Sequence, residues 1–175
     1  MIRRLSIFLL LLIPLNTSSV IAQEGASLFL EPQAGTFAVG STFSVFVFIN
    51  TNGKAVNAIE LDLKFDPTKL QVVSPTTDTS LLKIWIETPA YSNSQGTISL
   101  KGGVPSPGIN TNKGLLTTIN FRAKSTGSAG IKFAGESRVL ADDGKGTDIL
   151  TNTTGAALKL ILPPPAGPII SSPTH

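Results

Sequence analysis

The stretch AVNAIELDLKFD, residues 55–66, alternates apolar and polar side chains more regularly than any other part of the chain. Its apolar positions are Ile59, Leu61, Leu63 and Phe65, and the positions between them are Ala58, Glu60, Asp62 and Lys64. A period of two is typical of a β-strand with one buried face and one face in water. Asp66-Pro67 ends this strand, because proline has no N–H to donate to a sheet.

Similar strand patterns recur about every ten residues on both sides, separated by Gly, Pro, Asn and Asp. In residues 42–51 both faces are apolar, which predicts a central strand covered on both sides. Further strands are predicted at 27–30, 70–73, 81–87, 96–101, 115–124, 130–140 and 156–162, with a turn region at 32–40. Helix patterns are almost absent, so we predict an all-β fold, an antiparallel two-sheet sandwich.

Residues 81–87 contain the one tryptophan of the chain. Strict alternation would place Leu82, Ile84 and Ile86 on one face and Leu81, Lys83, Trp85 and Glu87 on the other. Trp85 would then lie among charged side chains, where such a ring can anchor a partner protein. The alternative is that Trp85 folds over the edge of the sandwich, under the loop at 89–95.

The first 22 residues predict export. Arg3 and Arg4 precede a long apolar stretch, and Val20-Ile21-Ala22 supplies the short side chains of a cleavage site. This order predicts a secretory signal peptide at 1–22, cleaved after Ala22. An uncleaved anchor is the alternative, although a bilayer span needs about 18 or more apolar residues and Pro14 interrupts this run.

The last 13 residues differ from the rest. Residues 163–175 open with three consecutive prolines, which favour an extended linker or tail and cannot continue a sheet. The globular domain is therefore predicted at 23–162, in a secreted or cell-surface protein. We expect no membrane span in the mature domain.

Charge and residue content argue against two classes of function, nucleic-acid binding and catalysis. The chain has 14 Lys+Arg against 11 Asp+Glu, and loss of Arg3 and Arg4 with the signal peptide reduces its net charge from +3 to +1. No basic cluster remains, so nucleic acid is not expected as a partner. With no cysteine and only His175 at the very end, the chain lacks a nucleophile–base pair, and we expect no enzyme activity.

The acidic loop at 142–148 is the best candidate for a metal site. It holds Asp142, Asp143 and Asp148 among glycines, and calcium prefers several oxygen ligands on a flexible turn. The spacing is not that of an EF-hand loop, and Lys145 would oppose a cation. Two interpretations stay open, a calcium site and a glycine-rich turn in which aspartates make local hydrogen bonds.

Several short motifs occur in the order and spacing found in cohesin domains. Those in the first half are Val39-Gly40-Ser41-Thr42-Phe43, Phe65-Asp66-Pro67 and Leu70-Gln71-Val72-Val73. Those in the second half are Gly108-Ile109, Asn112-Lys113-Gly114-Leu115-Leu116, Ile119-Asn120-Phe121-Arg122-Ala123-Lys124 and Ala129-Gly130-Ile131-Lys132-Phe133. On these motifs, over residues 27–162, the chain resembles the cohesin domain family.

The resemblance implies a jelly-roll sandwich of about nine strands that docks a dockerin, a module carried by polysaccharide-degrading enzymes and surface proteins. It places Glu60 where family members often carry an acidic docking residue, on a face that Asp62 and Lys64 extend. Trp85 is a further partner-binding candidate. The alternative is that these are simply solvated side chains.

Two other functions stay open from the sequence. A carbohydrate-binding module could hold a polysaccharide through Trp85 and Tyr91, although such a platform usually aligns several rings. A structural spacer of a surface protein would need no binding site.

Overall fold

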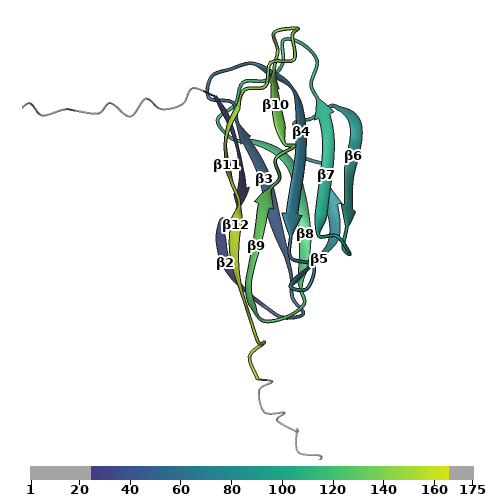
Figure 1. Ribbon diagram of the computed structural model, residues 1–175, viewed down its shortest axis with the longest axis vertical. Helices are drawn as coiled ribbons and strands as arrows, with labels where there is room; N and C mark the ends of the chain where they lie inside the picture. The colour runs from purple at the N-terminus through teal and green to yellow at the C-terminus, as the bar shows by residue number, and fades with distance from the viewer. Residues whose placement is uncertain (1–24, 166–175) are drawn as a thin grey trace, which may run out of the picture.

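The alternating stretch at 55–66 forms strand β4 (Val56–Phe65), inside a seven-stranded sheet of the computed structural model. The structure describes residues 25–165, which fold into two facing β-sheets without a helix (Figure 1). Alternate side chains of β4 are buried, among them Leu61 and Leu63, whereas Lys64 is exposed. The predicted two-sheet sandwich and the predicted inner and outer faces of this strand are therefore confirmed.

The seven-stranded sheet has the order β2-β12-β9-β4-β7-β6, and β10 pairs with β4 beyond the end of β9. Besides β4, its strands are β2 (Ala34–Ala38), β6 (Ile84–Ser92), β7 (Thr97–Gly103), β9 (Gly127–Phe133), β10 (Arg138–Ala141) and β12 (Ala156–Ile161). The five-stranded sheet has the order β11-β1-β3-β8-β5. Its strands are β1 (Ala26–Glu31), β3 (Thr42–Asn50), β5 (Leu70–Thr76), β8 (Gly114–Ala123) and β11 (Leu150–Thr154).

The core lies between the two sheets and is built from the inward residues of both. Phe121 of β8 is fully buried near its centre. Its ring stacks on Phe43 at 6.1 Å between centroids and meets the edge of Phe65 at 5.4 Å. Burying rings of this size supplies a large share of the hydrophobic stabilisation, and no disulfide is needed.

The outward side of β3 departs from the prediction. Phe46 and Phe48 point away from the core, and Phe46 is 38% exposed. No other element of the described chain lies over them as a further layer, since the structure has two sheets. The expectation that this strand is covered on both sides is wrong, because the rings pack on one another instead.

Both ends of the domain cross from one sheet to the other. β1 and β11 pair in parallel in the five-stranded sheet, and their continuations β2 and β12 pair in parallel in the seven-stranded sheet. Gly155 makes the second crossing, where a Cβ atom would lie 2.3 Å from the carbonyl oxygen of Ile131. The remaining strand pairs are antiparallel, as predicted.

Residues 25–165 form twelve strands where about nine were expected. The predicted turn at 32–40 contains β2, and β11 was not predicted at all. The predicted strand at 130–140 is two strands, β9 and β10, separated by residues 134–137. All three differences add short segments to the sandwich without changing its two layers.

The predicted signal peptide at 1–22 lies outside the described residues, as does the tail beyond residue 165. The described range contains no helix that is long and apolar enough to cross a membrane.

Candidate docking face

A row of four alternating charges crosses the outer surface of the seven-stranded sheet. Glu60 of β4 lies directly opposite Arg138 of β10 on one side and Lys101 of β7 on the other. Lys101 in turn lies opposite Glu87 of β6. Directly paired residues of antiparallel strands point to the same face, with Cβ atoms about 4.5–5.5 Å apart. These four side chains are called the charged row below.

Asp62 lies two residues further along β4, on the same face as Glu60. The Ser137 hydroxyl accepts a hydrogen bond from the Asp62 N–H and donates one to its C=O, both at 3.1 Å. The N–H of Ala134 also donates to that carbonyl, at 2.8 Å. The loop between β9 and β10 thus fills the gap along β4 and brings Glu136 near Asp62.

The surroundings of Asp62 disfavour its charged form. Burial raises the pKa of its carboxyl above the ordinary value, and the Glu136, Glu87 and Glu60 carboxylates raise it further, whereas Lys101 lowers it. We call these four carboxylates, Glu60, Asp62, Glu87 and Glu136, the acidic cluster. It is held in place partly by Ser99 of β7, whose hydroxyl donates to Glu87 Oε1 at 2.9 Å.

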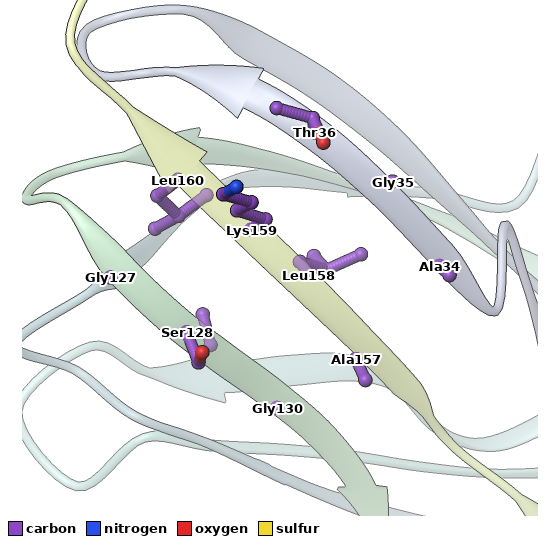
Figure 2. Close-up of a pocket in the computed structure, with 11 residues that line it drawn as sticks. Ala34, Gly35, Thr36, Gly127, Ser128, Gly130, Ala157, Leu158, Lys159 and Leu160 are labelled. Atoms are coloured by element: carbon purple, nitrogen blue, oxygen red, sulfur yellow. The ribbon is translucent and has the colours of Figure 1, made fainter.

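Lysines occupy the opposite end of the same face. Lys64 lies directly opposite Lys132 of β9, and both are exposed. Lys159 of β12 projects from a shallow depression of about 840 Å³ between β2, β12 and β9 (Figure 2). The floor of this depression is made of small side chains such as Ala34, Ser128 and Ala157. Lys64, Lys132 and Lys159 are called the lysine end below.

Trp85 is not on the charged face. It pairs with Gly102, is only partly buried, and packs against the core with its ring on the glycine; a Cβ at Gly102 would lie 3.3 Å from Trp85 Cε3. β6 begins at Ile84 and has two bulges, between Trp85 and Glu87 and between Glu87 and Ala90. The alternation predicted for residues 81–87 is therefore wrong, because the strand begins only at Ile84 and a bulge after Trp85 places Trp85 and Glu87 on opposite faces.

Two isoleucines of β6 are exposed in place of the tryptophan. Ile84 is 51% exposed and Ile86 is 77% exposed, at the free edge of the sheet formed by β6. Ile84 lies opposite Gly103, so it borders the same outer face as the charged row. These isoleucines add apolar surface next to the charged row, and protein interfaces combine apolar and polar area.

Each aspartate of the loop at 142–148 has its own hydrogen-bond donors. Asp142 accepts from the Asn57 amide at 3.1 Å and the Ser106 hydroxyl at 3.0 Å. Asp143 accepts from the N–H of Lys145 at 2.8 Å and from the Thr147 hydroxyl. These bonds, that of Thr147 foremost, hold the pKa of Asp143 below its ordinary value.

Asp148 accepts from the N–H groups of Val139 at 3.2 Å and Leu150 at 3.0 Å. Across residues 25–165 no group of three or more His, Cys, Asp or Glu side chains is arranged to hold a metal ion. Asp143 and Asp148 thus accept hydrogen bonds within their own hairpin, as the second interpretation expects, whereas Asp142 accepts from Asn57 and Ser106 of other parts of the chain. Calcium at this loop stays an untested prediction.

Comparison with known proteins assigns the family. The sequence profile of the cohesin domain matches residues 30–159. A search of curated protein sequences found no match. The chain belongs to the cohesin domain family, and the resemblance inferred from its motifs is confirmed.

Solved structures share the fold. The seventh ScaB type I cohesin of Pseudobacteroides cellulosolvens has a TM-score of 0.64 at 20% identity, over 86% of this chain and 99% of that one. The sixth scaffoldin B cohesin of Acetivibrio cellulolyticus, in complex with a Cel5 dockerin mutant, has a TM-score of 0.65 at 18% identity, over 78% and 99%. The Coh-OlpC-Doc435 cohesin–dockerin complex of Clostridium thermocellum has a TM-score of 0.64 at 16% identity, over 82% and 97%.

Proposed function

We propose that this chain is a non-catalytic docking module that binds a dockerin-like protein through the outer face of β4, β7 and β6. The observation that carries this proposal is the charged row, an ordered set of side chains on an outer sheet face that no further sheet of the described chain covers. Family membership supports it, because relatives of the same fold have been solved with dockerins bound. Glu60, Asp62 and Lys64 are the partner-binding residues that we propose.

A secreted or cell-surface location completes the proposal. It is supported by the sequence of residues 1–22, which carries the signal-peptide pattern, and by the proline-rich start of residues 163–175. A docking module needs no catalytic residues of its own. In a scaffold it would hold a partner, such as an enzyme acting on polysaccharides, at the place where that partner works.

Direct polysaccharide binding has less support from the geometry. A sugar platform requires aromatic faces open to solvent, whereas the Trp85 ring packs against the core beside Gly102. Tyr91, 44% exposed, lies opposite the buried Ile98 of β7 and is therefore not on the outer face that we propose. The spacer alternative would leave the charged row without a role.

The experiment that tests this function is a binding screen. The full chain is immobilised and exposed to an array of purified dockerins in calcium, with a cohesin of known partner as positive control. We expect at least one dockerin to bind with a Kd of about 1 µM or tighter, and Glu60→Lys with Asp62→Lys to weaken it at least about tenfold. Absence of binding across the array, with the control intact, would overturn the proposal.

A further inference from the structure

The two ends of the outer face of the seven-stranded sheet carry charges of opposite sign. One end holds the acidic cluster, four carboxylates accompanied by the two cations of the charged row, Lys101 and Arg138. The lysine end holds three lysines from three adjacent strands. The two ends meet within β4, where Asp62 and Lys64 are two residues apart.

The lysine end is unfavourable for the isolated module. Lys64 and Lys132 are directly opposite each other in β4 and β9, and like charges at such positions destabilise a sheet. The next carboxylate along the chain is that of Asp66. It accepts hydrogen bonds from the N–H and hydroxyl of Thr68, at 2.8 and 2.7 Å, and not from Lys64 or Lys132. Asp66 also interacts with Lys69 and Lys124.

In the acidic cluster the repulsion is between carboxylates. Three of its carboxylates act on Asp62, and the loop at 134–137 brings Glu136 there through the two Ser137 hydrogen bonds. A bound surface that supplied cations at this end and anions at the other would relieve both repulsions. Opposite charges meeting at both ends also fix the orientation of a partner, since the reversed arrangement opposes like charges.

We infer that the partner is bipolar and docks in one orientation, with basic side chains over the acidic cluster and acidic side chains over the lysine end. This inference rests on the proposed function, because it specifies the partner of the same face. The small side chains beside Lys159 let the partner's acidic end approach the sheet closely. An amphipathic helix with a basic half and an acidic half has the required chemistry.

The test uses a probe that is not a dockerin. A short synthetic helical peptide with lysines in one half and glutamates in the other carries a spin label at either end, and is mixed with the full isotope-labelled chain. A spin label on the peptide's lysine-containing half should broaden the amide signals of Glu60 and Asp62 at least about twofold more than that of Lys132. A label on the peptide's glutamate-containing half should broaden the signal of Lys132 more than those of Glu60 and Asp62. Equal broadening at both ends, or none, would overturn the inference.

Matched variants serve as controls. Glu60→Gln with Asp62→Asn should abolish the preference at the acidic end only, and Lys64→Gln with Lys132→Gln at the lysine end only. Salt at about 0.5 M should remove both preferences by screening. If the peptide shows the preference but no dockerin in the array binds, the proposed function fails and the charge division stands. If a dockerin binds but the peptide shows no preference, the bipolar partner is wrong and the docking function stands.

Discussion

The two outer faces of the sandwich are built by the same strand geometry but differ in chemistry. The face of β4, β7 and β6 carries the charged row, whereas the face of β1 and β3 carries Phe29, Phe46 and Phe48. On the aromatic face the side chains interact with one another. Phe48 stacks on Phe29 at 5.6 Å and on Phe46 at 6.2 Å between ring centroids.

The polar rim of the aromatic face is also internally paired. Lys113 Nζ lies 4.6 Å from the centroid of the Phe48 ring and 2.7 Å from Glu31 Oε2. Cation–π contacts and exposed ion pairs each contribute up to about 1 kcal/mol. The charged face is the opposite case, because its acidic cluster opposes the ionisation of Asp62. On this comparison the aromatic face contributes to the stability of the fold, whereas the charged face is the one to which we assign the proposed docking function.

The largest expected effect is the difference in the free energy of unfolding between removing a core ring, Phe121, and removing a ring of the aromatic face, Phe46. Phe121→Ala should lower the free energy of unfolding by about 3–5 kcal/mol, because the fully buried ring leaves a cavity. Phe46→Ala should cost under about 1 kcal/mol, since the ring is already partly in water. Urea unfolding of both variants measures the difference. Equal costs would mean that the aromatic face is covered, and would break the comparison.

The second prediction contrasts binding at the two faces. Glu60→Lys should weaken the affinity for a bound dockerin by at least about tenfold, because it places a cation within the charged row. Arg122→Glu reverses an exposed charge on β8, in the other sheet, and should leave the affinity unchanged. Surface-based binding measurements on both variants give the ratio. A larger loss for Arg122→Glu would move the docking site to the aromatic face.

The third prediction uses pH. The folded protein raises the pKa of Asp62 above its ordinary value of 3.8. The protonated Asp62 carboxyl therefore stabilises the fold most below pH 3.8, and this stabilisation is lost as the pH rises through the raised pKa. Asp62→Asn should therefore raise the Tm by about 1–3 °C at neutral pH. The gain should disappear at about pH 2, where the wild-type carboxyl is also neutral.

Asp66 is the matched control for this titration. Hydrogen bonds from Thr68 lower its pKa, so its stabilisation is present above 3.8 and is lost as the pH falls through the lowered pKa. Asp66→Asn should reduce the Tm at neutral pH, with a difference that shrinks in acid. Thermal melts at both pH values compare the two variants. If both substitutions changed the Tm at neutral pH in the same direction, the opposite pKa shifts of Asp62 and Asp66 would be contradicted.

The smallest expected effect concerns calcium and the loop at 142–148. Asp142, Asp143 and Asp148 already accept hydrogen bonds from separate donors, so an ion would have to displace them. We expect melts in millimolar calcium and in chelator to differ by less than about 1 °C. A rise of several degrees in calcium would establish the ion site that the sequence suggested and make this loop a third functional region.

Strands with one face in water could be predicted from the sequence, and irregular edges could not. β4 shows a clear period of two because its outer side chains are solvated. β6 begins only at Ile84, with Ile84 outward and Trp85 inward, and the bulge after Trp85 puts Glu87 on the outer face, so one continuous alternation over 81–87 does not hold. β2 and β11 were missed because they are short and depend on parallel pairing with a distant part of the chain.

The candidate site shows the same limit. Glu60, Asp62 and Lys64 could be assigned to one face from their spacing alone. That Lys101, Glu87 and Arg138 complete the row follows only from which strands are neighbours and in which register. The alternation in β7 contained the signal for Lys101, but nothing in the sequence indicated that the loop at 134–137 brings Glu136 beside Asp62.

The two parallel strand pairs have a mechanical consequence. β1 starts at one end of the molecule and β12 finishes at the other (Figure 1). A force that pulls Ala26 and Ile161 apart therefore slides β1 along β11 and β2 along β12. All the hydrogen bonds of these pairs are then loaded together rather than opened one by one. A module tethered through these two ends can carry tension along its length while the charged row stays in register.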